Sequence, residues 1–199
     1  NASSEVPVVA VEAGPGSGVP VVAVDQLAGA GEATRHPLEL GHATGHHVTG
    51  PPRSLEAGLR TRAWHDALRD AGRPAPEPLA GDWSPRSGYD QGRALAADRE
   101  VTAVFVANDP TALGVVRALH AAGRRIPGEI SVVGFDDIPE APYFTPPLTT
   151  VRQDFGELGS RSLRVLVRAI EAAGAGAPAP AGSLIAPHLI VRESTAPPC

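Results

Sequence analysis

The stretch VTAVFVANDPTALGVVRALHAAGRRIPGEISVVGFDD, residues 101–137, decides the fold class. It contains two short apolar runs, VTAVFVAND (101–109) and EISVVGFDD (129–137), which have the length and composition of buried strands. Between them, TALGVVRALHAAG (111–123) has the apolar spacing of a helix and ends at Gly123, a residue type that commonly terminates helices. A strand, a helix and a second strand in this order predict a parallel strand–helix–strand unit.

The rest of the chain repeats this alternation. Strands are predicted at 6–11, 19–24, 46–50, 78–83 and 184–193. Helices are predicted at 26–40, 54–71, 86–97 and 154–173. Pro37 should kink or shorten the first helix, and Pro187 gives the final strand the character of a sheet edge. A linker rich in proline, alanine and glycine covers 173–183. The sequence therefore predicts an α/β fold with a parallel sheet flanked by helices.

Composition excludes several classes of protein. The formal charge is −5 and all 17 basic residues are arginines without a basic run, so the chain is a poor nucleic-acid binder by itself. Cys199 is the only cysteine, so no intrachain disulfide is possible and nothing demands an oxidising compartment. No apolar run approaches membrane-spanning length, and no signal peptide is visible in a chain that starts at Asn1.

Polar residues follow most of the predicted strands. They are Glu12, Asp25, Trp83, Asn108 with Asp109, and Asp136 with Asp137. In parallel sheets, ligands bind outside the carboxyl ends of the strands, so these side chains predict a shared binding crevice. Asp and Asn at strand ends also cap the next helix, and for any single position that alternative is open. For the whole set, helix capping alone is a weaker explanation than a shared binding crevice.

The run 101–159, with its motifs AND…ALG, VVGFDD and FTPPLTTVRQ, resembles the effector-binding domain of the lac/galactose repressor family of bacterial transcription regulators. The upstream order agrees: VAVDQLAGAGEATRHPLELGH (22–42), VTGPP (48–52), SLEAGLRTRAWHDAL (54–68) and GDWSPRSGY (81–89). The resemblance covers roughly residues 6–195. It implies a periplasmic-binding-protein-like fold, in which two α/β subdomains enclose a ligand cleft and are joined by crossing strands.

The resemblance also implies a division of this chain. Residues 25–152 correspond to a complete C-terminal subdomain and 1–24 to the end of the N-terminal, DNA-proximal subdomain. Residues 153–183 cross back to that subdomain, and 184–199 form the final strand and tail. We expect an N-terminally truncated polypeptide, because the helix-turn-helix, the hinge helix and the first elements of the DNA-proximal subdomain are not found.

The function implied is that of a ligand-sensing, dimerising region of a cytoplasmic transcription regulator. It would bind a sugar or a related small effector and affect operator DNA only through the missing N-terminal domain. No catalysis, cofactor or membrane association is expected. The alternative is a periplasmic-type sugar-binding protein of a transporter, and a purine effector also stays open.

Seven residues are candidates for effector contacts. Asp136 would accept hydrogen bonds from two hydroxyls of the sugar, and Asn108 would both donate and accept hydrogen bonds. Arg60 would donate hydrogen bonds through the forked N–H groups of its guanidinium. Trp83 would stack on the face of a sugar, and Phe155 would close the apolar wall with Gln153 near the hinge. Glu12 would supply an acid from the other subdomain. Each also has a structural alternative: helix caps, solvated or ion-paired charges, or ordinary core.

Other motifs carry less weight. Asp137 is predicted to be structural, because successive side chains on a strand point in opposite directions. GPGSG (14–18) matches no phosphate-binding pattern, and His42, His46 and His47 lack an acidic partner at helical spacing. No G-x-S-x-G elbow is present, and the paired carboxylates at 136–137 have no companion nucleophile, base or metal cluster, so a hydrolase is disfavoured.

The segment ATGHH (43–47) is expected to weaken its strand, and Tyr143 and Phe144 are expected to pack beneath the proline-rich loop.

Overall fold

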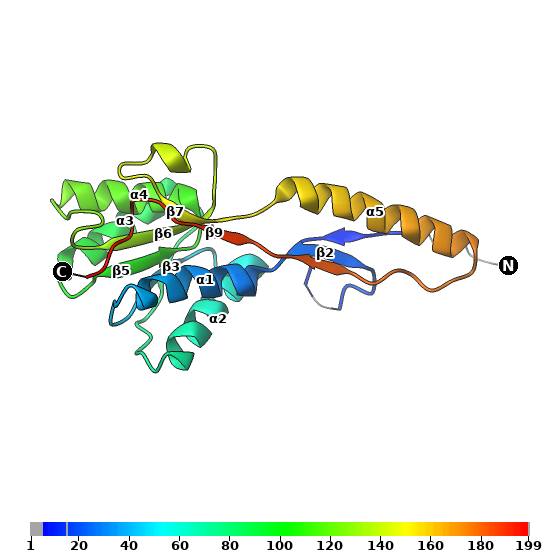
Figure 1. The fold of residues 1–199 in the computed structure, drawn as a ribbon, viewed down its shortest axis with the longest axis horizontal. Coiled ribbons are helices and arrows are strands. Elements are labelled where there is room, and N and C mark those ends of the chain that lie inside the picture. Colours follow the sequence, from blue (N-terminus) through cyan, green and yellow to red (C-terminus); the bar gives the residue numbers. More distant parts are fainter. Residues whose placement is uncertain (1–5, 15, 199) are drawn as a thin grey trace. The chain divides into compact units, whose positions relative to one another are not determined.

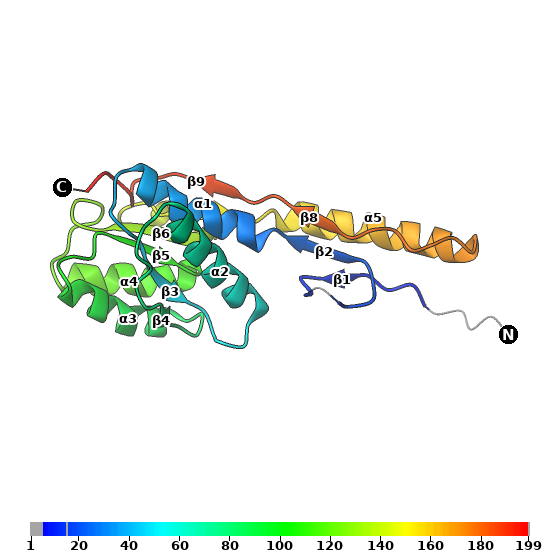
Figure 2. The ribbon, with the colours of Figure 1, turned by 90° about the horizontal axis from the view of Figure 1, so that it is seen from below.

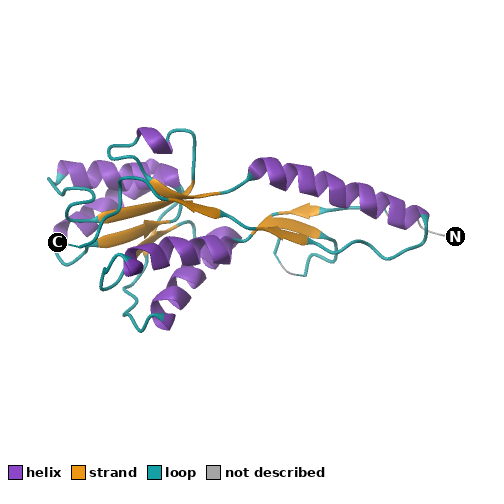
Figure 3. Cartoon of the chain, viewed as in Figure 1, coloured by secondary structure: helices purple, strands orange, loops and turns teal. Residues whose placement is uncertain are grey.

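The computed structural model describes residues 6–14 and 16–198, which form two compact units. The larger unit contains Gln26–Arg152 and the described part of the C-terminal segment from His188 onward. The smaller unit contains the described residues up to Asp25 together with Gln153–Pro187. Figures 1 and 2 together label the helices and strands of both units, and Figure 3 distinguishes helices from strands.

The larger unit is built on a six-stranded sheet in the order β4-β3-β5-β6-β7-β9. Its strands are β3 (His46–Thr49), β4 (Leu79–Ala80), β5 (Ala103–Val106), β6 (Ser131–Asp136), β7 (Thr149–Arg152) and β9 (His188–Ile190). The first five pair in parallel, and β9 runs antiparallel to β7 at the edge. The central strands β5 and β6 are buried along almost their whole length, as expected for a parallel sheet covered on both faces.

Helices cover both faces of this sheet (Figures 1 and 2). One pair is α1 (Gln26–Glu39) and α2 (Leu55–Asp70), and the other is α3 (Pro85–Ala97) and α4 (Asp109–Ala121). The α1/α2 side has a core centred on Trp64, Phe105 and Phe135. The α3/α4 side has an aliphatic core that includes Val104, Val115 and other valine, leucine and isoleucine side chains. The predicted α/β class with a parallel sheet and flanking helices is confirmed.

Local sequence explains where the helices begin. Ser54, Ser84 and Asn108 each have extended backbone, and the side-chain oxygen of each accepts a hydrogen bond from a backbone N–H of the first helical turn. Each cap lies within five residues of the carboxyl end of the preceding strand, and ligands bind at this edge of the sheet in such folds.

The smaller unit has a three-stranded parallel sheet in the order β1-β2-β8, and helix α5 (Phe155–Gly174) packs on β2 (Figure 1). Its strands are β1 (Ala10–Val11), β2 (Val21–Val24) and β8 (Ser183–Ile185). The core consists of five buried residues: Val22, Val24, Leu158, Val165 and Ile185. Leu163, Val167 and Ile170 of α5 are exposed.

Several predicted elements differ from the structure. The buried strand predicted at 6–11 is only Ala10–Val11 and is largely exposed, because it lies at the edge of a narrow sheet. The strand predicted at 78–83 is also reduced to two residues, Leu79–Ala80. The single strand predicted at 184–193 is two strands in different sheets, β8 and β9, because the chain passes from one unit to the other at Ala186 and Pro187. Pro37 lies within the last turn of α1, which ends at Glu39.

The prediction for the two aromatic residues after β6 was half wrong. Phe144 is buried in the aliphatic core, but Tyr143 is 84% exposed. Both residues follow Ala141, where a short 3₁₀ helix, η1 (Ala141–Tyr143), turns the chain so that adjacent side chains point in different directions. No helix in the part of the chain that the structure describes is long and apolar enough to span a bilayer.

Candidate functional site

Arg60 is the central side chain at the carboxyl edge of the larger sheet. It projects from α2 and is only 4% exposed, although its guanidinium carries a full charge. Its Nε donates to Oε1 of Gln26 at 2.8 Å, and its Nη1 donates to the backbone carbonyl oxygen of Ala107. The guanidinium carbon lies 3.7 Å from the ring centroid of Phe135, in a cation–π contact. The orientation of the arginine is therefore fixed from three other elements.

Two predicted effector residues face Arg60. Nη1 of Arg60 lies 3.5 Å from Oδ1 of Asp136, the last residue of β6, and the carboxylate side chain is 22% exposed. The guanidinium carbon lies 5.6 Å from the ring centroid of Trp83, in the loop between β4 and α3. Asp136 is partly accessible and can offer acceptor oxygens while its charge is balanced by the buried arginine.

Asn108 joins this group through Trp83. Its Nδ2 donates to the backbone carbonyl oxygen of Trp83 at 3.3 Å, and its Oδ1 accepts from the N–H of Thr111 at 2.9 Å. The helix-capping alternative is thus correct for Asn108, which begins α4. The structure brings together all four candidates of the larger unit, Arg60, Trp83, Asn108 and Asp136, although Arg60 projects from α2 and the other three follow or end three different strands.

The backbone near this group is strained. Trp83, Asp136 and Asp137 have φ angles of 72°, 114° and 51°. Residues with a Cβ rarely adopt this region, and such strain is concentrated where side chains must be held in functional orientations. Both Trp83 and Asp136, which are proposed to contact the effector, are held in this way.

Asp137 has different partners from Asp136. Its carboxylate side chain is 5% exposed and forms ion pairs of 2.6 Å with Nε of Arg152 and with Nη2 of Arg192. Arg152 is the last residue of β7, and Arg192 follows β9 and also donates to the carbonyl oxygen of Leu148. Asp137 therefore ties the tip of β6 to β7 and to the C-terminal segment, and its structural role is confirmed.

Asp109 follows a predicted strand, but it was not among the seven candidate effector residues. It is the first residue of α4 and has no exposed surface. Burial raises the pKa of this carboxyl to about 7, while hydrogen bonds from Thr150 and from the N–H of Ile138 act in the opposite direction. Gln26 and Phe135 were missed as well. Their signal was position: Asp109 and Phe135 adjoin candidate residues, and Gln26 follows Asp25 at the end of a predicted strand.

The other three candidates lie in the smaller unit. Glu12 has a φ of 52°, and its Oε1 accepts from the N–H of Val24 at 2.8 Å, so it joins the ends of β1 and β2. Gln153 is buried, with 9% of its surface exposed. Phe155 is the first residue of α5 and is 58% exposed, so it is not ordinary core. Effector contacts by these three residues stay predictions.

The histidines have structural surroundings. His47 is fully buried, stacks between Trp64 and Phe105 and has its pKa lowered to about 4, because burial disfavours the imidazolium form. His42 lies against Thr102, Ser131 and the carbonyl oxygen of Ala196. Across the described residues, no group of three or more His, Cys, Asp or Glu side chains is placed to hold a metal ion.

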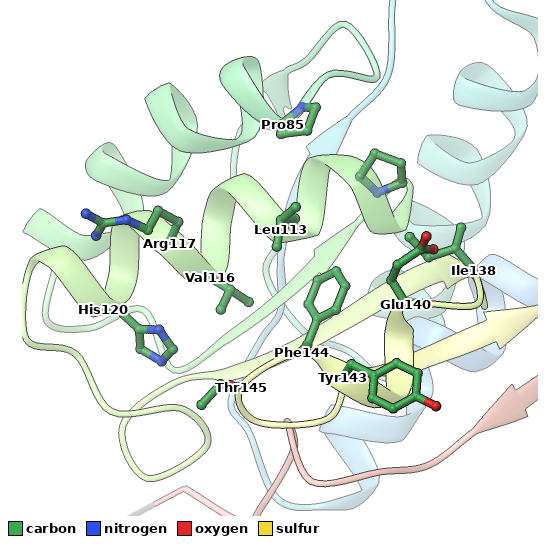
Figure 4. Close-up of a pocket in the computed structure, with 11 residues that line it drawn as sticks. Pro85, Leu113, Val116, Arg117, His120, Ile138, Glu140, Tyr143, Phe144 and Thr145 are labelled. Carbon is green, nitrogen blue, oxygen red and sulfur yellow. The ribbon is translucent and has the colours of Figure 1, made fainter.

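A pocket of about 680 Å³ lies beside α4 (Figure 4), and its lining includes Pro85, Pro110 and Ile138, each two residues from a candidate effector residue. Leu113 and Val116 line it from α4, and Tyr143 and Phe144 line it from η1 and the residue that follows. Leu113 is 48% exposed and Tyr143 is 84% exposed. None of the seven candidate effector residues lines this pocket.

Comparison with known proteins gives a consistent relationship. The model of the periplasmic binding protein-like domain matches residues 34–195. The lactose operon repressor of Klebsiella pneumoniae is 36% identical over 188 residues, which cover 94% of this chain and 52% of that protein. The chain therefore spans about half the length of the curated relatives it matches.

Solved structures agree with these matches. A dimeric Lac Repressor with a C-terminal deletion superposes with a TM-score of 0.86 at 31% identity, over 96% of this chain and 69% of that one. The complex of the transcriptional regulator CelR with cellobiose superposes with a TM-score of 0.81 at 33% identity, over 94% of this chain and 58% of that one. These relatives are transcription regulators, not enzymes. The chain belongs to the periplasmic binding protein-like domain family and represents the effector-binding region of the lac/galactose repressor family.

Proposed function

We propose that this chain is the ligand-sensing and dimerisation region of a cytoplasmic, lac-repressor-like transcription regulator. Its effector is a sugar or a related polyhydroxylated molecule, bound at the carboxyl edge of the larger sheet. Effector binding is coupled to operator DNA through a DNA-binding domain outside these 199 residues. Glu12, Gln153 and Phe155 of the smaller unit are proposed as further effector contacts.

The observation that carries this proposal is the convergence of Arg60, Trp83, Asn108 and Asp136. The carboxylate of Asp136 lies 3.5 Å from the guanidinium of Arg60, so a partly exposed acceptor and a fork of donors are adjacent. The ring of Trp83 lies against the same guanidinium. Hydroxyl groups need acceptors and donors side by side, and the C–H face of a sugar ring packs on an aromatic surface. The lactose operon repressor and the CelR–cellobiose complex among the relatives support a carbohydrate.

The effector is identified by measuring thermal stability with lactose, cellobiose, ribose and purine bases. A ligand that binds the native state raises the melting temperature as its concentration exceeds its Kd. The affinity of the best ligand is then measured by calorimetry in the parent and in Asp136→Ala. The variant should lose binding by at least about a hundredfold, because two hydroxyl contacts to a charged acceptor are removed, at about 1.5–3 kcal/mol each.

Asp98→Asn is a suitable control for Asp136→Ala. Asp98 is an exposed carboxylate after α3, where its Oδ1 accepts from the N–H of Glu100 at 2.9 Å. This variant should bind like the parent. Equal affinity in the parent and in Asp136→Ala would remove Asp136 from the site, and the absence of a thermal shift with every compound would contradict a sugar or purine effector.

Dimerisation is the second part of the proposal. The relatives include a dimeric Lac Repressor. Leu113 and Tyr143 are the two large exposed hydrophobic residues that border one apolar pocket, on the α4 and η1 face of the larger unit (Figure 4). Exposed apolar surface of this kind, next to a hollow that can receive a side chain, favours association with a protein partner. We propose a second copy of this chain as that partner.

A further inference from the structure

The buried carboxylate of Asp109 contacts two neighbouring strands of the larger sheet, β6 and β7. Asp109 begins α4, directly after Asn108, and its Oδ1 accepts from the hydroxyl of Thr150 on β7 at 2.6 Å. Thr150 pairs in register with Gly134 of β6. Burying a carboxylate is energetically unfavourable unless its oxygens accept hydrogen bonds. Asp109 has no exposed surface, so its burial against the sheet needs a structural explanation.

Gly134 of β6 leaves the space that this carboxylate occupies. A glycine within a buried strand weakens the strand, because it supplies no side chain to pack. At this position a Cβ would lie 2.2 Å from Oδ1 of Asp109 and 2.8 Å from Cδ2 of Leu148. The space that a side chain of β6 would fill is therefore occupied by the acid group from α4.

The second oxygen of Asp109 holds the turn that follows β6. Its Oδ2 accepts from the backbone N–H of Ile138 at 3.0 Å. The two residues before Ile138 are Asp136 and Asp137, whose φ angles of 114° and 51° lie in the left-handed region. A turn with two such residues in succession persists only if its surroundings hold it. Asp109 contributes one contact at Ile138, and Asp137 contributes its ion pairs and a hydrogen bond of 3.4 Å from its backbone N–H to the hydroxyl oxygen of Thr150.

We propose that Asp109 is a positioning residue of the effector site, which holds the turn at 136–138 so that the carboxylate of Asp136 faces Arg60 and the ligand. This inference rests on the proposed function, because it assigns a role in binding to a residue that does not touch the effector. It connects the helix that carries Asn108 to the strand that carries Asp136, and so couples two effector contacts through one side chain.

The electrostatic surroundings are consistent with this role. Asp136 and Asp137 face Asp109 from the end of β6 and raise its pKa in addition to burial, and β7 contributes the neutral hydroxyl of Thr150. The nearby arginines are committed to the other two acids: Arg60 lies beside Asp136, while Arg152 and Arg192 pair with Asp137. Asp109 therefore holds the turn through hydrogen bonds and not through an ion pair of its own among the described contacts.

The test compares Asp109→Ala with Asp109→Asn and with Thr34→Val as a control. Asn keeps an acceptor oxygen for Ile138, whereas Ala keeps none. Thr34 is a buried threonine whose hydroxyl donates to the carbonyl oxygen of Ala30 within α1, so its replacement removes a buried hydrogen bond that does not involve residues 136–138. Two quantities are measured for each protein: the hydrogen-exchange rate of the amide of Ile138, and the calorimetric affinity for whichever of lactose, cellobiose and ribose binds the parent most tightly.

Asp109→Ala should exchange at Ile138 at least about tenfold faster and bind at least about tenfold more weakly. Asp109→Asn should recover most of both losses, and Thr34→Val should match the parent in both. An unchanged exchange rate in Asp109→Ala, or faster exchange with parental affinity, would overturn the positioning role. Failure of the parent itself to bind any of the three sugars would overturn the sugar-binding function and this inference with it.

Discussion

Gly50 and Trp83 are in direct contact: a Cβ on Gly50 would lie 2.3 Å from Cη2 and Cζ2 of the indole ring. Gly50 follows β3, and Trp83 follows β4, the neighbouring strand. The missing side chain of the VTGPP turn is therefore what allows the indole to reach Arg60. The glycine is required here by close approach of a side chain and not by an unusual backbone angle.

Gly50→Ala should displace Trp83 and weaken effector binding. Even one added methyl group cannot fit beside the ring, and forced repacking destabilises by about 1–3 kcal/mol. We expect a loss of affinity of about tenfold or more by calorimetry.

Gly58→Ala is a matched control, because Gly58 is an exposed residue of α2 and a Cβ there would meet nothing within 4 Å. Since alanine favours helix over glycine, this variant should gain roughly 0.5–1 kcal/mol of stability and keep its affinity. Parental affinity in Gly50→Ala would show that the position of Trp83 does not matter for binding.

Asp137→Ala should destabilise the larger unit more than the loss of an ordinary surface ion pair. Its side chain is 5% exposed, and its removal leaves Arg192, 14% exposed, without the carboxylate 2.6 Å away. Breaking a buried pair on one side costs about 3–5 kcal/mol, measured as the free energy of unfolding in urea.

Arg125→Ala provides the comparison, because Arg125 is 74% exposed in its pair with Glu129 and such pairs contribute about 0–1 kcal/mol. Equal effects of the two substitutions would mean that Asp137 does not tie β6 to the C-terminal segment.

Asp109 should make stability depend on pH between about 4 and 7. Its pKa is raised from 3.8 to about 7 in the folded chain, chiefly by burial, so the native state holds this proton more tightly than the unfolded state. The resulting stabilisation is complete below pH 3.8 and is lost as pH rises through about 7. Asp109→Asn carries no such proton. Its unfolding free energy relative to the parent should therefore rise by up to a few kcal/mol from pH 4 to pH 7, at about 1.4 kcal/mol per pKa unit.

Urea unfolding of both proteins at several pH values measures this difference. The parent curve alone is not diagnostic, because His47, with its pKa lowered to about 4, contributes an opposite slope as pH falls below 6.5. The difference between the two proteins cancels that contribution. Parallel curves would mean that Asp109 does not titrate in this range.

Leu113→Asp should dissociate the proposed dimer without unfolding the chain. Leu113 is 48% exposed at the edge of the α4 pocket, so a charge is tolerated in a monomer but is buried in an interface. Sedimentation velocity should show a monomer for this variant and a dimer for the parent. Leu55→Asp, at an exposed leucine of α2, is the control and should stay dimeric. A monomeric parent would contradict dimerisation, and a dimeric Leu113→Asp would place the interface elsewhere.

Most of the architecture could be predicted from sequence. The apolar runs within 101–109 and 129–137 are typical of buried strands, and the structure buries them as β5 and β6. The helices predicted at 54–71, 86–97 and 111–123 begin within two residues of the observed starts of α2, α3 and α4, because capping and helical periodicity are local properties of the chain. The short edge elements were predicted too long or merged, since whether a strand is paired depends on neighbours that are distant in sequence.

The candidate site was predictable in part for the same reason. Parallel topology places the carboxyl ends of neighbouring strands at one edge, so the sequence pattern indicated that Trp83, Asn108 and Asp136 belong together, while Arg60 was a candidate through the family resemblance. It could not indicate that Arg60 is held by Gln26 and Phe135, or that Asp137 turns to Arg152 and Arg192. Those contacts join residues separated by tens of positions.

Local patterns were therefore enough to predict the fold class, the order of the elements and the edge of the sheet where polar groups collect, because periodicity and capping act over a few residues. Which of those polar groups are accessible to a ligand and which are buried and hydrogen-bonded depends on contacts between distant parts of the chain. Asp109, Asp136 and Asp137 are alike in sequence, but one is enclosed by Gly134 and Thr150, one faces Arg60, and one pairs with two arginines. The strand register and the left-handed turn after β6, which no local pattern encodes, separate their roles.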